Sequence, residues 1–311
     1  MLPVVLFLTV VEVFEVAGRF TPPTQGSVSI HRVLSPYTAH TTAEADGHFA
    51  FKSLEPGAYT LTIVVPSRGE TRRTLEVGPS TADQRGRVVV NLELKDQDFV
   101  LEDVLNRRHA VTVKQLAIPA KAIREYEEAD HVLAKNQVGA ALKHLEHAVE
   151  LAPQYAAAWN HLGTIAYQAQ NMTRAAECFR EALRHEPELF EALVNLGGVL
   201  LKLHQSYEAY QYNMRALLAR RNDPLANAQF GMSYLQLGNA DMAEKFLRNA
   251  AEIDPAHFSH PQLVLADIHV RRGDRSAAAE DLEGFLRAHP DWPQAGALRD
   301  KIAEWTPSDD Q

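Results

Sequence analysis

The chain has 311 residues, of which 46% are hydrophobic and 23% are charged, so it is long enough for one large domain or two ordinary ones. A formal net charge of −9 argues against nucleic-acid binding, because nucleic-acid-binding proteins usually present a basic face. The single cysteine, Cys178, excludes an intrachain disulfide, and its place beside Phe179 in a helical segment predicts a small buried side chain.

An apolar run opens the chain between Leu2 and Val11, interrupted by Pro3 and Thr9. The run is too short to span a bilayer, which needs about twenty residues, but it has the length of a signal-peptide core. No lysine or arginine precedes it, so an apolar first strand of the following domain is the alternative. We therefore expect residues 1–11 to be the remnant of a secretory signal and the protein to be bacterial and periplasmic or secreted. A cytoplasmic location is the alternative.

Residues 12–95 have the sequence pattern of an antiparallel β-sandwich, because short β-branched runs alternate with turn-forming stretches. Alternation is clearest where Tyr59, Leu61 and Ile63 face one way and the intervening threonines face the other. The expected strands are 13–20, 27–34, 48–52, 59–65, 71–77 and 87–94.

Three segments of this half carry a resemblance to a known family: VAGRF at 16–20, DGHFAF at 46–51 and LEPGAYTL at 54–61. They are similar to the carboxypeptidase regulatory-like domain, a transthyretin-like sandwich of seven strands in the carbohydrate-binding-like fold group. The resemblance implies an accessory role in secreted or cell-surface proteins and no peptidase activity. Some relatives bind starch, which makes a glycan a possible ligand, but Tyr37 and Tyr59 are equally well explained by packing.

Residues 96–118 are predicted to connect this domain to the second half of the chain. Val111, Thr112 and Val113 within it read as one further strand that docks the two halves. Pro119 suits the first turn of a helix, where a missing N–H group costs nothing.

Three glycines, Gly163, Gly197 and Gly231, recur in the second half at intervals of thirty-four residues. A fixed period of this size is typical of a solenoid of two-helix repeats. In the clearest unit, WNHLG at 159–163 is followed at the same spacings by Ala175, Phe179, Ala182 and Pro187. This pattern resembles the tetratricopeptide repeat, which implies helix pairs that present a curved surface to a partner.

The resemblance predicts five repeats, at about 119–153, 154–187, 188–221, 222–255 and 256–290. The small residue at the eighth position of a unit lets its second helix approach closely. Leu265 replaces that small residue in the fifth unit, which is therefore the least regular. A capping helix is expected at 291–305, with Asp291 as its N-cap and an apolar stripe of Leu298, Ile302 and Trp305.

The same register places the first-helix residues of successive units in rows on one inner face. We predict that this concave groove binds a neutral to apolar peptide or protein segment. The alternative for any single residue is packing between helices. Lys202 is the only evident basic side chain of the groove, which argues against the carboxylate clamp of chaperone-tail-binding relatives. The predicted groove residues are Tyr126, Asn160, Thr164, Tyr167, Gln168, Val194, Leu201, Met232, Leu235, Gln236 and His269.

No phosphate loop, nucleophile elbow or paired-cysteine zinc motif is present in the sequence. His144 and His147 lie three residues apart on a predicted helix, but a catalytic zinc needs three protein ligands. We therefore predict a non-enzymatic interaction scaffold without metal or cofactor, in which a β-sandwich precedes an all-α solenoid. The alternatives are a cell-surface glycan-binding protein that uses its repeats for assembly, and an accessory subunit of an enzyme.

Overall fold

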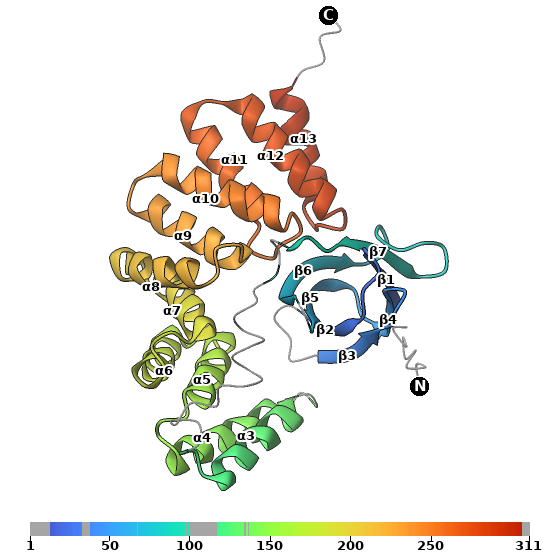
Figure 1. Ribbon diagram of the computed structural model, residues 1–311. Coiled ribbons are helices and arrows are strands. Elements are labelled where there is room, and N and C mark those ends of the chain that lie inside the picture. The colour runs from blue at the N-terminus through green and yellow to red at the C-terminus, as the bar shows by residue number, and fades with distance from the viewer. Residues whose placement is uncertain are drawn as a thin grey trace, which may run out of the picture.

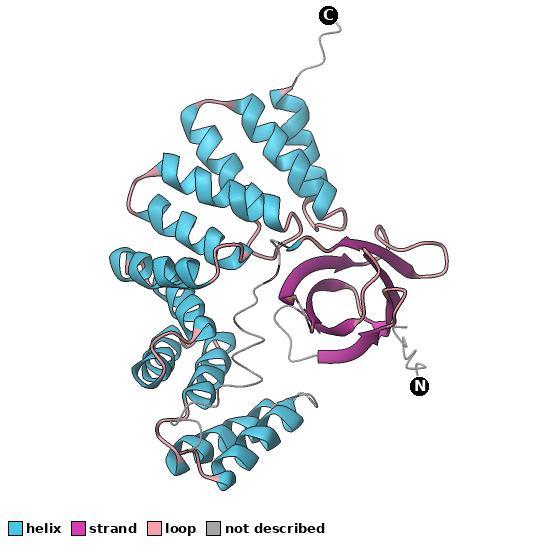
Figure 2. Ribbon diagram, in the orientation of Figure 1, coloured by secondary structure: helices cyan, strands magenta, loops and turns pink. Residues whose placement is uncertain are grey.

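The computed structural model describes residues 13–32, 38–66, 68–96, 99, 117–133, 135 and 137–306. The predicted signal remnant, the expected strand at Val111–Val113 and the C-terminal tail lie outside these residues. Strands occupy the first part of the described chain and helices the second, and the two kinds of structure do not intermix (Figures 1 and 2). The predicted fold class, a β-sandwich followed by a helical solenoid, is confirmed.

The strands of the described residues form two sheets, of three strands in the order β4-β1-β7 and of four in the order β3-β2-β5-β6. All pairs are antiparallel except β1 and β7, which run parallel. The strand β3 has the sequence TAHTTA, whose lack of large apolar residues explains why no strand was predicted there. The strands are β1 (Phe14–Thr21), β2 (Gly26–Arg32), β3 (Thr38–Ala43), β4 (His48–Leu54), β5 (Gly57–Val65), β6 (Gly69–Val77) and β7 (Arg87–Glu93).

The core of the sandwich is filled from both sheets by side chains that alternate along the strands. Phe49 and Phe51 are both buried, as their spacing predicts. Phe49 lies over Gly18, where any side chain would collide with its ring. Tyr59 is 1% exposed and donates its hydroxyl hydrogen to the backbone oxygen of Glu55 at 2.9 Å, so it belongs to the core and satisfies its polar end locally.

The helices of the described residues pair as antiparallel hairpins that stack side by side, and a final helix follows the last pair. No helix within the described ranges combines the length and the apolar composition that crossing a membrane requires. The pairs are α3 (Ala120–Leu133) with α4 (Val138–Leu151), α5 (Ala156–Gln168) with α6 (Met172–His185), α7 (Phe190–Lys202) with α8 (Ser206–Ala219), α9 (Pro224–Gln236) with α10 (Ala240–Ile253), and α11 (Pro261–Arg272) with α12 (Arg275–Ala288); the final helix is α13 (Ala295–Trp305).

At the periodic glycines the two helices of a pair pack closely against each other. A methyl group added at Gly163 would lie 2.5 Å from the ring of Phe179, and one at Gly231 would lie 2.9 Å from Cγ of Leu247. At Gly197 the partner is Asn213, which is fully buried at the position where the neighbouring units have Phe179 and Leu247. The predicted reason for these glycines, close approach of the second helix, therefore matches the packing.

The C-terminal helix differs from the prediction at its start. Asp291 does not cap it: α13 begins at Ala295, and Oδ2 of Asp291 accepts a hydrogen bond from the backbone N–H of Ser80 in the sandwich at 3.1 Å. The predicted stripe does pack, since Ile302 is buried and Leu298 and Trp305 are partly buried against α12 and its neighbours. The residue expected to cap a helix thus joins the two halves of the molecule.

The helices form a C-shaped array, and the sandwich lies on its concave side next to α9–α13 (Figure 1). Several of the side chains that meet the sandwich, among them Asp254, His289 and Asp291, come from the loops that connect one repeat with the next. Because β6 is an edge strand, its free backbone groups need partners. Asp254, in the loop after α10, supplies one such partner: its Oδ2 accepts a hydrogen bond from the backbone N–H of Thr74 at 2.9 Å.

Candidate functional site

A charged cluster holds the sandwich against the middle of the helical array. Arg72 on β6 pairs with the buried carboxylate of Glu70 at 2.8 Å and reaches Glu191 of α7 at 3.8 Å. Arg220 also pairs with Glu191, at 3.3 Å, and its guanidinium lies 3.9 Å above the ring of Phe190. Burial opposes the charge of Arg72, but Glu70, Asp223 and Glu191 together raise its pKa. Arg72 is therefore the cation shared by carboxylates of both halves.

A second polar contact joins β6 to the C-terminal repeats. Nδ1 of His289, which is 1% exposed, lies 2.8 Å from Oε1 of Glu76. A carboxylate oxygen can only accept there, so Nδ1 carries the hydrogen. Nε2 of His289 has no hydrogen-bond partner among the described residues. The rings of His260 and Trp292 pack around His289.

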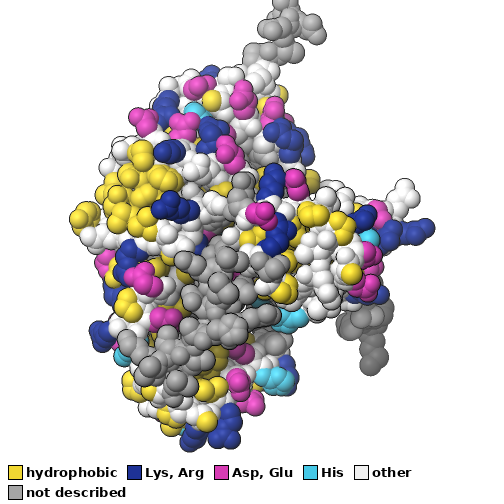
Figure 3. All heavy atoms as spheres, in the orientation of Figure 1, with side chains coloured by type: hydrophobic (Ala, Val, Ile, Leu, Met, Phe, Trp, Pro, Cys, Tyr) yellow, Lys and Arg dark blue, Asp and Glu magenta, His cyan; other side chains and the backbone are white. Residues whose placement is uncertain are grey.

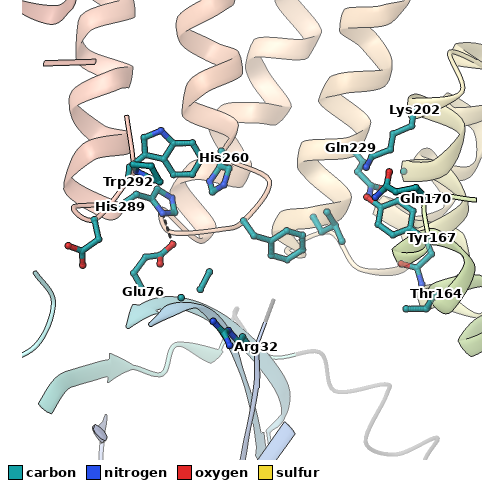
Figure 4. Close-up of a pocket in the computed structure, with 18 of the residues that line it drawn as sticks. Arg32, Glu76, Thr164, Tyr167, Gln170, Lys202, Gln229, His260, His289 and Trp292 are labelled. Atoms are coloured by element: carbon teal, nitrogen blue, oxygen red, sulfur yellow. Dashed lines mark hydrogen bonds and ion pairs between the residues drawn. The ribbon is translucent and has the colours of Figure 1, made fainter. Parts of the chain in front are cut away.

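Between these contacts and the helices α5, α7 and α9 lies a cavity of about 730 Å³, within the size range of ligand-binding pockets. Figure 4 shows two groups of side chains that face each other across it. One group, with His260, His289 and Trp292, comes from the loops of the last repeats, and the other comes from α5 with the turn after it, α7 and α9. Arg32 and Glu76 of the sandwich approach from the third side. Both halves of the chain thus line one cavity.

Amide side chains line the helical wall of the cavity. Asn195 and Gln229 are thirty-four residues apart and so occupy the same position in consecutive units. Nδ2 of Asn195 donates to Oδ1 of Asn160 at 3.2 Å. Oε1 of Gln229 is buried and has no partner among the described residues. Gly198 makes room for Gln229, since a methyl group there would lie 2.6 Å from its Nε2.

The predicted groove residues divide into those that line the cavity and those that pack. Thr164 and Tyr167 line it, and Nζ of Lys202 lies 4.5 Å from the centre of the Tyr167 ring. Gln168 is exposed at the end of α5. The packed ones are Asn160, Val194, Leu201 and His269, which are buried; Met232 and Leu235, which are half-buried in hydrophobic clusters; Tyr126, which stacks on His161; and Gln236, which bonds the backbone oxygen of Leu201.

These helices match a known repeat family. The tetratricopeptide repeat family matches residues 126–187 and residues 226–257. These two segments of the helical half are tetratricopeptide repeats. A curated relative, tetratricopeptide repeat protein 5 of Homo sapiens, is 28% identical over 182 residues, which are 52% of this chain and 41% of the relative. Tetratricopeptide repeat-containing protein trd-1 of Caenorhabditis elegans is 25% identical over 149 residues, 47% of this chain and 17% of the relative.

Solved structures show the same helical fold. MamA residues 41-end from Desulfovibrio magneticus RS-1 superimposes with a TM-score of 0.51 at 21% identity, over 57% of this chain and 99% of that chain. PilW, a type IV pilus biogenesis factor, superimposes with a TM-score of 0.53 at 21% identity, over 60% of this chain and 86% of that one. The chain spans less than half the length of the curated relatives it matches. The likeness to these structures is one of fold: stacked pairs of antiparallel helices.

Several residues of the site could not be read from the repeat pattern. The position of Asn195 and Gln229 lies within the tetratricopeptide register, so extending the predicted rows by one residue would have found them. No repeat spacing marks the other residues of the site, because they come from the sandwich and from inter-repeat loops: Arg32, Glu76, His260, His289 and Trp292.

The prediction that the β half is a carboxypeptidase regulatory-like domain stays a prediction. Its strands show a β-rich half and do not identify this particular family.

His144 and His147, the two histidines considered as metal ligands, both contact the carboxylate of Glu125. Nδ1 of His144 lies 2.7 Å from Oε2 of Glu125, and Nδ1 of His147 lies 3.1 Å from Oε1. The hydrogen bond from His144 lowers the pKa of Glu125. No group of three or more potential metal ligands is found within the described part of the chain.

Buried histidines in the last repeats make stability depend on pH. Burial lowers the pKa of His257 to about 3 and that of His260 to about 4. Below the ordinary histidine pKa of 6.5 the unfolded chain therefore binds more protons at these sites, and stability falls as the pH falls. Burial raises the pKa of Asp254 to about 6, which acts oppositely, because this contribution is lost as the pH rises towards 6. Burial also raises the pKa of Asp281, which acts in the same sense as Asp254, whereas hydrogen bonds lower the pKa of Glu244, whose contribution is lost as the pH falls. We expect the net change to be a loss in acid.

We expect the melting temperature to fall between pH 6.5 and pH 4, and the fall to be smaller in His257→Gln. The matched control is His131→Gln at an exposed position on α3, which should keep the wild-type slope. Differential scanning calorimetry across this pH range measures the three slopes. Equal slopes in wild type and His257→Gln would show that His257 is not responsible.

Proposed function

We propose that this protein is a non-enzymatic scaffold that captures a peptide or protein segment on the concave face of its tetratricopeptide repeats. The observation that carries the proposal is the cavity on that face, where α5, α7 and α9 contribute side chains from three consecutive repeats. Amide groups and aromatic rings line it together, which suits an extended segment: amides bond its backbone and rings contact its side chains.

Tyr167 offers the sharpest test because it lines the cavity and is only half-buried. We expect Tyr167→Ala to reduce partner capture about tenfold, since aromatic anchors often cost more than 1 kcal/mol when truncated. The control is Tyr207→Ala, on α8, whose side chain is 69% exposed and outside the cavity lining. Quantitative affinity capture with the full chain as bait, with melting temperatures of both variants, provides the measurement. Equal capture by both variants would argue against the concave face.

A further inference from the structure

The β-sandwich forms one wall of the cavity and is more than a neighbour of the repeats. Arg32, Gly57, Ala58 and Glu76 contribute to the lining from strands β2, β5 and β6. The contacts of Thr74 with Asp254 and of Ser80 with Asp291 hold this wall in place. A ligand in the cavity therefore touches both halves.

The charges around the cavity are unevenly balanced. Its two acidic side chains are engaged: Glu76 by His289, and Asp291 by the N–H of Ser80. Arg32 is paired with Glu55 and donates to the backbone oxygen of Pro56 at 2.8 Å. Lys202, by contrast, rests on the ring of Tyr167, and no carboxylate among the described residues pairs with it. The helical wall thus presents a cation without a matching anion.

The rest of the lining is apolar or accepts hydrogen bonds. Leu225, Phe258 and Trp292 provide apolar surface. The unpartnered Oε1 of Gln229 calls for an N–H donor, which a peptide backbone supplies.

We propose that the cavity between the sandwich and the repeats binds an extended peptide segment in which acidic and apolar side chains alternate, with the sandwich as one wall of the site. The acidic side chain pairs with Lys202, the apolar side chain contacts Leu225, Phe258 and Trp292, and a backbone N–H donates to Gln229. The proposal rests on the proposed function and adds to it the chemistry of the segment and the part of the sandwich. The formal charge of −9 works against an acidic ligand, so a preference for one would have to arise locally.

The test uses three fluorescein-labelled nine-residue peptides in which leucine alternates with glutamate, glutamine or lysine. Fluorescence anisotropy with the full chain at about 0.15 M salt should show the glutamate peptide binding roughly 3- to 10-fold more tightly than the glutamine peptide. In Lys202→Glu the order should reverse in favour of the lysine peptide. Lys143→Glu, at an exposed position on α4, changes the net charge equally and should keep the wild-type order.

Arg72→Met, which removes the cation shared by both halves at a position outside the cavity lining, should weaken binding of the glutamate peptide at least about fivefold. An order of affinities that Lys202→Glu leaves unchanged, or full binding by Arg72→Met in a state shown to be undocked, would overturn the proposal. So would light scattering that shows a dimer dissociating in Lys202→Glu, because a second copy would then occupy the groove. If these tests fail while Tyr167→Ala still reduces partner capture, the scaffold function stands and only the composite site is wrong.

Discussion

Replacing Arg72 by methionine is expected to release the β-sandwich from the helical array. The substitution removes one of the two cations that Glu70, which is 5% exposed, shares with Asp223, and leaves Arg220 as the other. Breaking a buried ion pair costs about 3–5 kcal/mol, whereas exposed pairs contribute about 1 kcal/mol or less. Since 34% of the Arg72 side chain is exposed, we expect the docked state to lose an intermediate amount, about 1–3 kcal/mol.

Small-angle X-ray scattering measures this release as an increase in the radius of gyration, because the domains separate while each stays folded. Arg85→Met is the matched control, since Arg85 is an exposed arginine of the same sandwich. It should scatter like the wild type. A radius of gyration unchanged by Arg72→Met would mean that the remaining contacts, at Asp254, His289 and Asp291, suffice for docking.

Gly197→Ala is expected to destabilise the repeats although alanine is the better helix former. Alanine in place of a helical glycine normally adds about 0.5–1 kcal/mol of stability. At Gly197 the new methyl group would overlap with the amide of Asn213. That amide cannot move freely, because Nδ2 donates to Oγ of Ser233 at 2.9 Å and to the backbone oxygen of Gln229 at 3.3 Å. Overpacking typically costs about 1–3 kcal/mol, so the net effect is a loss.

Gly139→Ala isolates the propensity effect, because a methyl group at Gly139 on α4 meets nothing within 4 Å. It should raise the free energy of unfolding by about 0.5–1 kcal/mol, while Gly197→Ala lowers it. Urea denaturation followed by circular dichroism at 222 nm measures both. If the two variants shift stability in the same direction, close packing at Gly197 is not what the periodic glycine serves.

The repeat architecture could be predicted because its contacts are local and periodic. The pairs α5–α6 and α9–α10 use the same spacing between a small residue and the large one that packs on it, so Gly163 with Phe179 and Gly231 with Leu247 obey one rule. The strands could be predicted in the same way wherever apolar residues alternate. The strand β3 has too few of them, and its position is decided by pairing with β2.

The docking of the two halves could not be predicted from these patterns. Thr74 and Asp254 are 180 residues apart, and their contact is not repeated from one unit to the next, so no sequence spacing predicts it. The same holds for Glu76 with His289 and for Ser80 with Asp291. Only the helical wall of the candidate site could therefore be predicted from the sequence. Thr164 and Tyr167 follow the repeat register, whereas the opposite wall depends on how the sandwich docks against the helices.

Residues of one predicted row differ in burial, which the sequence spacing does not predict. Leu201 and Tyr167 occupy equivalent positions in consecutive units, yet Leu201 is 8% exposed inside a hydrophobic cluster while Tyr167 lines the cavity. A second apolar region competes as a contact surface: hydrophobic side chains gather over α9 and α10, where Leu237 is 46% exposed (Figure 3). The cavity lies between the repeats and the sandwich, whereas this apolar region does not include the sandwich, so the two differ more in location than in composition.

Hydrogen–deuterium exchange of the full chain with and without a captured partner tests the central claim most directly. The groove account predicts that binding slows amide exchange in α5, α7 and α9 and in the sandwich strands β2 and β6 that face them. Slowed exchange confined to α10 and the turn at Leu237, with α5 and α7 unchanged, would contradict it and place the partner on the apolar surface over α9 and α10.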